Sequence, residues 1–238
     1  MTSSASERVA LSWSGGKDSA LALWALRGEL GIEPTALIST VTTEYDRVTT
    51  HGVRRDLLHA QALATGVPLV EVELPAACTN EEYDKRMARA LESEPLALAT
   101  TIAFADLFLA DIRAYREERL AQADRRGLFP LWGRDTRDLA AEFVQAGFKA
   151  TLVCVDPKQL DRSFAGREFD RWLLSALPGA VDPCGENGEF HTFVHAGPVF
   201  AHPIEIEHGQ TVARDGFVFH DLLVPRQKRA SIATGRAR

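Results

Sequence analysis

The sequence has few cysteines, and they lie far apart. Its three cysteines are Cys78, Cys154 and Cys184, and none belongs to a CxxC pair. A disulfide framework and a zinc ribbon are therefore not expected, and the thiols should be reduced. Long apolar runs are also lacking, since no stretch of about 18 apolar residues is present, and this predicts no membrane-spanning helix. The start of the chain, MTSSASERVALSW, is unlike a secretory signal, so we expect a cytoplasmic protein without membrane association.

An excess of positive charge is missing as well. The formal net charge is -6 and the pI is near 5.7, which argues against a protein that binds nucleic acid through its overall field. Residues 226–238 form a basic tail without an acidic residue, and a solvated chain end is the favoured interpretation of this tail. Stable nucleic-acid binding is therefore not expected.

The composition itself is that of an ordinary globular protein. Hydrophobic residues make up 45% and charged residues 25% of 238 residues, which is enough for one large core or two moderate ones. Strands are expected at 9–13, 35–41, 67–74, within 96–105 and at 128–132, and helices at about 20–26, 52–65, 80–91 and 106–125. Asn80 is the expected N-cap of the third helix. This alternation predicts an α/β fold with a parallel sheet covered by helices on both faces.

Three loops of this sheet are expected to lie together. Ligands bind beyond the carboxyl ends of parallel strands. Three loops are expected at the carboxyl ends of these strands: the glycine turn 14–19, the loop 42–51 and the turn 104–106. They should therefore share one rim.

After Pro130 the pattern changes. A helix at 135–146 and a strand at 150–155 continue the alternation, a helix follows at 168–177, and short alternating runs occupy 189–194 and 216–224. We therefore expect a sheet domain at 1–130, a smaller α+β domain at 131–225, and the tail at 226–238.

The strongest local motif is SGGKDS, residues 14–19, which follows a buried strand and opens a helix. Gly15 and Gly16 let the backbone approach an anion closely, and the helix adds free N–H groups and a positive dipole end. Lys17 adds a point charge. A capped helix start after a tight turn is the plainer interpretation. It does not explain why a lysine stands between Gly15-Gly16 and Asp18-Ser19.

The remaining side chains of the motif fit a phosphate site. The hydroxyls of Ser14 and Ser19 can donate to phosphate oxygens. Asp18 would repel a phosphate unless a divalent cation lies between them, so Asp18 indicates a metal ligand and Mg²⁺. The spacing is not that of a Walker A motif.

This motif resembles the PP-loop of the N-type ATP pyrophosphatases, which cleave ATP between its α and β phosphates. Within that superfamily the chain is similar to the diphthine-ammonia ligase family. Three further stretches carry the resemblance, which covers residues 8 to about 224: FADLFLADIR at 104–113, FPLWGR at 129–134 and CGENGEFHT at 184–192.

The resemblance implies a PP-loop domain of HUP-like, Rossmann-like fold at 1–130 and an acceptor-side domain after it. It implies ATP with Mg²⁺, with the triphosphate on residues 14–19 and the adenine near Ser39 and Ala105. An acceptor oxygen would take AMP from ATP, and ammonia would then displace AMP to form an amide. The family pattern has glycine where Ala105 stands, and the extra methyl would narrow the adenine pocket.

A second cluster of reactive side chains lies in the GENGEFHT stretch. Glu186, Glu189 and His191 are candidate catalytic residues beside Lys17 and Asp18. Two carboxylates would attract ammonium, and His191 could accept a proton. A turn with solvated acids before an edge strand explains the residue types equally well, and only the resemblance favours a chemical role.

Five other side chains are open to two interpretations each. His51 is expected at the rim, either against a ligand or as a helix cap. Cys184 borders the second cluster and is either a reactive thiol or a small buried one, and the buried thiol is favoured. Arg113, Arg116 and Arg119 recur every three residues on one helix, and a solvated face is favoured over a phosphate clamp.

The leading hypothesis is an ATP-dependent, amide-forming ligase similar to diphthine-ammonia ligase. A PP-loop enzyme that modifies RNA, or an adenine-nucleotide-binding protein without turnover, is the alternative. The acceptor implied by the family is diphthine on elongation factor 2, if the source is archaeal or eukaryotic. The chain has 22 arginines against 5 lysines and 34 alanines, a bias that indicates a GC-rich genome. In a bacterium the acceptor would be a different, unknown molecule.

Overall fold

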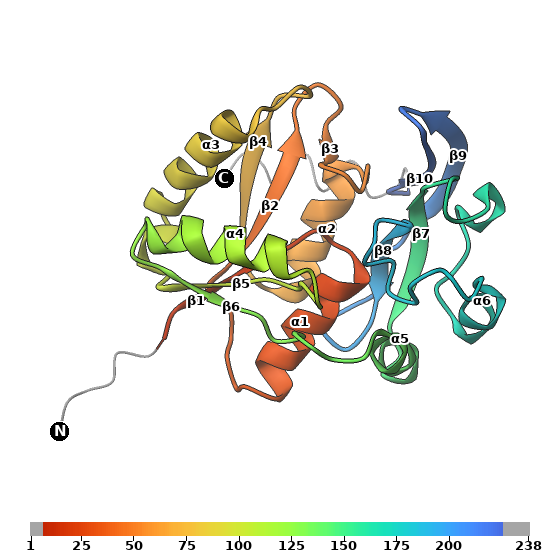
Figure 1. Ribbon diagram of the computed structural model, residues 1–238, viewed down its shortest axis with the longest axis horizontal. Helices are drawn as coiled ribbons and strands as arrows, with labels where there is room; N and C mark the ends of the chain where they lie inside the picture. Colours follow the sequence, from red (N-terminus) through yellow and green to blue (C-terminus); the bar gives the residue numbers. More distant parts are fainter. Residues whose placement is uncertain (1–6, 226–238) are drawn as a thin grey trace.

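The structure, a computed structural model, describes residues 7–225 and contains two β-sheets with helices around them (Figure 1). The larger sheet is built from β1 Val9–Ser12, β2 Ala36–Thr42, β3 Arg47–Val48, β4 Leu69–Leu74, β5 Thr101–Ala103 and β6 Arg126–Leu128. Strands β4, β2, β1, β5 and β6 are parallel neighbours in that order, and only the short β3 runs antiparallel, against the end of β2. The predicted parallel α/β sheet is confirmed.

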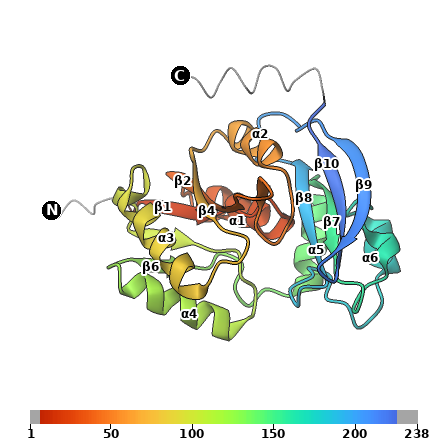
Figure 2. The same cartoon turned by 90° about the horizontal axis from the view of Figure 1, so that it is seen from above.

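Helices cover both faces of this sheet, as Figure 2 shows. They are α1 Lys17–Gly28, α2 Arg55–Thr65, α3 Asn80–Glu92 and α4 Ala110–Ala121. Successive strand residues point to opposite faces. Val9 and Leu11 therefore pack in the cluster that holds α1 and α2, whereas Ala10 packs in the cluster that holds residues of α3 and α4.

The smaller sheet is antiparallel, with strand order β8-β7-β10-β9. Its elements are α5 Thr136–Gln145, β7 Lys149–Val155, α6 Arg171–Ala176, β8 Phe190–Ala196, β9 Glu207–Arg214 and β10 Phe217–Leu223. One-turn 3₁₀ helices occupy Leu96–Leu98 and Arg162–Phe164. The predicted smaller mixed region after the parallel sheet is thus present.

One buried cluster joins the two sheets. Trp24 of α1 meets Phe148 edge to face, with ring centroids 6.0 Å apart, and Phe148 stacks on Phe143 of α5 at 4.8 Å. Strand β8 lies against α1. The first and second parts of the chain therefore share a core rather than meeting at a wet interface.

Several predicted boundaries are wrong. The N-cap of α3 is Thr79, whose Oγ1 accepts from the N–H of Glu82 at 3.2 Å, and not Asn80. The strand expected at 128–132 lies at β6, where Arg126–Leu128 pairs with β5. Helix α4 covers only part of the predicted 106–125, because residues 106–109 form the turn at the pocket.

Two strands of the described chain were not predicted, and a third was predicted in the wrong sheet. Strand β9 is exposed along nearly its whole length and so has no apolar alternation, and β3 has only two residues. Strand β7, expected to continue the parallel alternation, pairs antiparallel in the smaller sheet. The basic tail, 226–238, lies outside the described residues. Within residues 7–225 no helix is long and apolar enough to cross a membrane.

Candidate functional site

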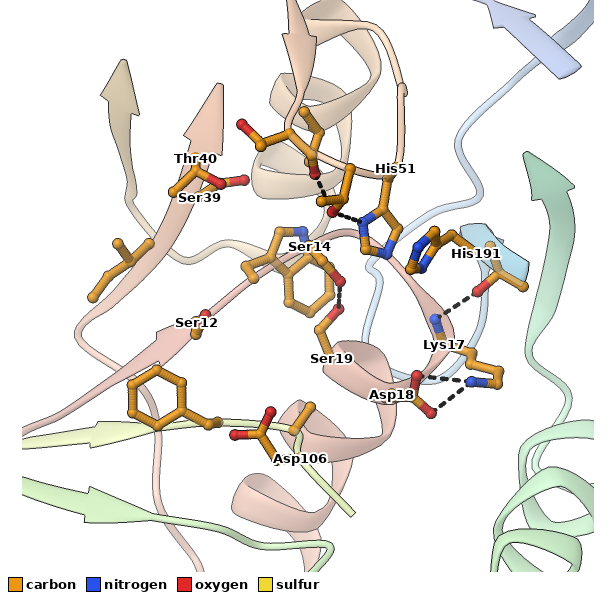
Figure 3. A pocket seen from close by; sticks show the side chains of 18 of the residues that line it. Ser12, Ser14, Lys17, Asp18, Ser19, Ser39, Thr40, His51, Asp106 and His191 are labelled. Atoms are coloured by element: carbon orange, nitrogen blue, oxygen red, sulfur yellow. Dashed lines mark hydrogen bonds and ion pairs between the residues drawn. The ribbon is translucent and has the colours of Figure 1, made fainter. Parts of the chain in front are cut away.

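A cavity of about 360 Å³ opens at the carboxyl ends of the parallel strands (Figure 3). Four segments line it, residues of 12–19, 48–51, 104–106 and 184–192, together with residues 38–40 of β2 and side chains of α3, β5 and α4. The first three are the loops that were predicted to share a rim, and their meeting is confirmed. The fourth comes from the smaller sheet, so both parts of the chain build this one cavity.

The glycine turn is held in a fixed shape at the start of α1. Gly15 has a φ of 77°, and a methyl group there would collide with Gln61 Oε1. A methyl on Gly16 would lie 3.1 Å from His51 Nε2. Gly16 is also the N-cap of α1 and makes no side-chain cap hydrogen bond. The first amide of α1, that of Lys17, donates to Thr192 Oγ1, and the amides that follow it in the first turn face the end of the helix where an anionic ligand binds.

Gln61 of α2 positions the turn from behind. Its Oε1 accepts from Trp13 Nε1 at 3.0 Å, while its Nε2 donates to the carbonyls of Gly15 at 2.9 Å and Val194 at 2.7 Å. The side chain is fully buried. Gln61 was not among the predicted site residues, although a glutamine on the apolar side of a helix was a usable signal.

Strand β8 docks directly on the same turn. The N–H of Lys17 donates to Thr192 Oγ1 at 3.0 Å, and the N–H of Val194 donates to the carbonyl of Gly15 at 3.0 Å. The two motifs singled out in the sequence, SGGKDS and GENGEFHT, are therefore in direct contact although they are far apart along the chain.

Lys17 is buried to 2% exposure and points at carboxylate and carbonyl oxygens. Its Nζ donates to both oxygens of Asp18, each at 2.7 Å, and to the carbonyl of Cys184. Figure 3 shows the Lys17 and Asp18 side chains directed at each other. Burial works to lower the pKa of Lys17, but Asp18 and its hydrogen bond raise it above its ordinary value, so the amine is charged.

Glu186 lines the pocket, and its Oε1 accepts from the N–H of Leu107 at 3.0 Å. Burial raises the pKa of Glu186 to about 7, and the charges of Asp18 and Asp106 work in the same direction, against the Leu107 hydrogen bond. The pocket thus holds a carboxyl group that titrates near neutral pH.

Glu189 has a different environment from the one expected. It precedes β8, which begins at Phe190 rather than at 189, and it is absent from the residues that line the cavity. Its carboxylate is 1% exposed and accepts from the N–H groups of Asp182 and Asn187, each at 2.9 Å. Those bonds stabilise the turn at residues 185–188. Glu189 therefore does not line the cavity that Glu186 lines.

His51 and His191 lie side by side at the cavity, with ring centroids 4.4 Å apart. Burial lowers the pKa of His191 to about 4, and burial followed by the neighbouring His191 lowers the pKa of His51 well below its usual range. Both imidazoles are therefore neutral at pH 7 and able to accept a proton or a hydrogen bond.

The two residues expected near an adenine both reach the cavity. Ser39 is 2% exposed, and its Oγ has no hydrogen-bond partner among the described residues, so it is free to bond a ligand. Ala105 is not among the four non-glycine residues of the described chain with positive φ. Alanine consequently fits the backbone of this turn without strain.

Arg116 differs from the solvated face predicted for its helix. It lines the cavity, lies over the Phe104 ring at 4.3 Å and pairs with Asp106 at 2.8 Å between Nε and Oδ2. Arg113 covers the rings of Phe129 and Trp132 instead. The prediction of a solvated face is therefore wrong for Arg116.

The donor set suits a nucleotide phosphate with a divalent cation better than a protein-only metal site. Within residues 7–225 no group of three or more His, Cys, Asp or Glu side chains could hold a metal ion. Mg²⁺ binds through one or two carboxylates together with substrate phosphates, and the carboxylates of Asp18 and Asp106 both line the cavity. The Ser39 hydroxyl, which has no hydrogen-bond partner among the described residues, and the glycine turn at the start of α1 fit the nucleotide itself.

Comparisons with known proteins agree with this geometry. The sequence is similar to diphthine–ammonia ligase from Danio rerio, with 33% identity over 118 residues, which are 47% of this chain and 46% of that protein. The match thus spans about half the length of the curated relative. The family model of the diphthamide synthase N-terminal domain matches residues 7–119, and that of the diphthamide synthase C-terminal domain matches residues 135–221. Since these two matches follow each other across both sheets, the chain belongs to the diphthamide synthase family.

Proposed function

We propose that this protein is an ATP-dependent ligase that converts a carboxylate into an amide with ammonia. The observation that carries the proposal is the contact between the two motifs: the phosphate-type turn at the start of α1 is hydrogen-bonded to β8, and both face one cavity. The name of the zebrafish relative, diphthine–ammonia ligase, supplies the reaction class.

The reaction has two balanced steps. A carboxylate oxygen of the acceptor attacks the α-phosphorus of ATP, which forms an acyl adenylate and releases pyrophosphate. Ammonia then attacks the acyl carbon, AMP leaves, and one proton is lost as the amide forms. Neither step needs a nucleophile from the protein, so the enzyme acts by alignment and charge stabilisation.

The residues of the cavity can be assigned to these steps. The turn 14–19, with the hydroxyls of Ser14 and Ser19, binds the triphosphate, and Lys17 stabilises the charge that develops on pyrophosphate. Ser39 and Ala105 line the nucleoside end. Mg²⁺, held by Asp18 with the phosphates, would supply further charge neutralisation when bound.

Glu186 and His191 serve the acceptor side of the cavity. Both reach the cavity, and His191 is neutral and so able to take up the proton lost in the second step. Glu189 acts indirectly, because its bonds to Asp182 and Asn187 fix the turn that presents Glu186.

The products of turnover test the proposal. Incubation with ATP, Mg²⁺, ammonium and a carboxylate acceptor, beginning with elongation factor 2 that carries diphthine, should yield AMP, pyrophosphate and amide in equal amounts. Release of ADP would overturn it.

Replacement of Lys17 tests the mechanism more narrowly. Lys17→Ala should lower the rate of AMP release at least about 100-fold, because a preorganised charge at the leaving group is lost. Lys149→Ala is the matched control, since Lys149 pairs with Glu168 on the surface of the smaller sheet. Equal rates for the Lys17 variant and the wild type would remove Lys17 from the mechanism.

A further inference from the structure

The Lys17 ammonium group occupies a cage whose chemistry suits any small ammonium ion. Two carboxylate oxygens of Asp18 and the carbonyl oxygen of Cys184 accept its hydrogen atoms, and the Phe190 ring lies 5.7 Å from Nζ. Glu186 is close enough to act electrostatically on the same charge. We call this set, the Asp18 and Glu186 carboxylates, the Cys184 carbonyl and the Phe190 ring, the ammonium cage.

Each wall of the cage has a separate physical use for an ammonium ion. Carboxylate and carbonyl oxygens accept its N–H groups in charge-assisted hydrogen bonds. An aromatic face attracts a cation within about 6 Å of the ring centroid. The low exposure of Lys17 and Phe190, 2% each, removes competing water.

The phosphate site lies next to the same lysine. Lys17 is the first residue of α1, directly after the glycine turn. Its four-carbon stem is flexible, and a bound triphosphate would offer its charge several anionic oxygens at once. Movement of Nζ to the phosphates would leave the cage without its cation, with buried oxygens that need one.

We propose that the ammonium cage is the binding site of the ammonium substrate, and that Lys17 fills it until nucleotide binding draws the lysine to the phosphates. The inference rests on the proposed function for the identity of the substrate. It orders the reaction, because the nitrogen donor gains its site only after ATP has bound, next to the turn where the acyl adenylate forms.

Part of the cage is shared with the predicted metal site. Asp18 belongs to both, whereas the Cys184 carbonyl and the Phe190 ring belong to the cage alone. Phe190 is therefore the residue whose replacement reports on ammonium and not on Mg²⁺.

Thermal unfolding tests the cage without turnover. Lys17→Ala empties the cage, so 200 mM ammonium chloride should raise the melting temperature of this variant by roughly 3 °C more than sodium chloride of equal concentration, as expected for a ligand at several times its Kd. The wild type without nucleotide should show no such difference. In the wild type loaded with α,β-methylene ATP, which cannot be cleaved at the reacting bond, the difference should return.

Matched double variants assign the effect to the cage. Phe190→Leu in the Lys17→Ala background should abolish the difference between the two salts. Phe169→Leu in that background should keep it, because Phe169 is equally buried and packs on Phe190 at 6.2 Å but does not line the cavity. Equal responses to ammonium and sodium in both the Lys17 variant and the loaded wild type would overturn the proposal, as would full retention of the effect with Phe190→Leu.

Failure of the ligase proposal gives a different result. If the protein binds ammonium in these assays but forms no AMP with any acceptor, the ammonium cage is supported and the ligase reaction is excluded. If the protein forms AMP and amide but its melting temperature does not respond specifically to ammonium, the ligase reaction is supported and the ammonium cage is excluded.

Discussion

Gln61 lies outside the glycine turn and holds it through hydrogen bonds. It satisfies Trp13 Nε1 and the carbonyls of Gly15 and Val194 with one fully buried side chain. These three groups belong to the parallel sheet, the glycine turn and β8. A single amide therefore sets the spacing between the turn and the second motif.

Replacement of this glutamine by leucine should destabilise the protein strongly. Gln61→Leu leaves the buried Trp13 Nε1–H without its acceptor. It also removes one donor each from the carbonyls of Val194 and Gly15, of which Gly15 keeps the N–H of Val194. Each buried group left unsatisfied costs about 1–3 kcal/mol. We expect a loss of about 3–5 kcal/mol in the free energy of unfolding, measured by urea denaturation. Gln145→Leu, at the exposed end of α5, is the control and should change it by less than about 0.5 kcal/mol. Similar values for the two variants would contradict the role of Gln61.

The carboxyl group of Glu186 should make stability depend on pH. Burial raises its pKa to about 7 in the folded protein from an ordinary value of 4.5. The folded chain therefore binds more protons than the unfolded chain between these values, and the contribution of Glu186 to stability falls as pH rises from about 4.5 to 7. Glutamine does not titrate, so a variant with glutamine at this position does not lose stability in this way as pH rises. Glu186→Gln should gain about 1–2 kcal/mol relative to the wild type between pH 5 and pH 8, after allowance for the partial exposure of this group.

Urea denaturation of both chains at the two pH values measures this difference. His51 and His191 also titrate differently on folding, but they are present in both chains and cancel in the comparison. A difference between the two chains that is the same at pH 5 and pH 8 would contradict the raised pKa.

At the scale of elements, strand β10 holds the loop that carries His51. Asp221 of β10 pairs with Arg47 at 2.9 Å and with Arg54 at 2.7 Å, which flank the loop on both sides. Phe219 of the same strand packs on Gly52, where a methyl group would lie 2.8 Å from its ring. The smaller sheet thus fixes a loop of the larger one at the cavity.

Loss of this anchor should free the loop. Asp221→Asn weakens both arginine pairs, and we expect trypsin to cleave after Arg47 or Arg54 at least about fivefold faster, because local opening controls the rate of cleavage. Glu73→Gln is the matched control, since it removes an exposed carboxylate from Arg55 outside this loop. An unchanged rate of cleavage in Asp221→Asn would show that the ion pairs do not hold the loop.

The elements also show how far the sequence predicts this molecule. The parallel strands and the rim followed from local signals: apolar runs, the glycines of the turn and Gly66, which ends α2 in the left-handed conformation. Strand β9 had no such signal because its residues are exposed. The contacts that shape the site, such as Lys17 with Thr192, join residues 175 positions apart and leave no local pattern. The same holds for the internal role of Glu189.

At the scale of the whole molecule, the two sheets depend on each other. The main hydrophobic cluster contains residues of α1, α2, α5, β7 and β8 together. Polar bonds add to this, because β8 is bonded to both the glycine turn and Gln61. The sequence predicts a domain boundary near residue 130, where the pattern of strands and helices changes. The packing nevertheless joins the segments on either side of residue 130 in one hydrophobic core.

This shared core predicts one cooperative unfolding transition for the whole chain. Far-UV circular dichroism and tryptophan fluorescence should give the same midpoint in urea, and the calorimetric and van't Hoff enthalpies should agree. Phe148→Ala, which removes a ring between α1 and α5, should lower the stability of the entire chain by about 3–5 kcal/mol without splitting the transition. Trp172→Ala is the control for loss of an aromatic ring, because Trp172 is 65% exposed on α6 and its removal should leave the midpoint nearly unchanged. Two separate transitions in the wild type, or loss of only part of the structure in Phe148→Ala, would show that the sheets fold independently and that the cavity between them forms only after both are complete.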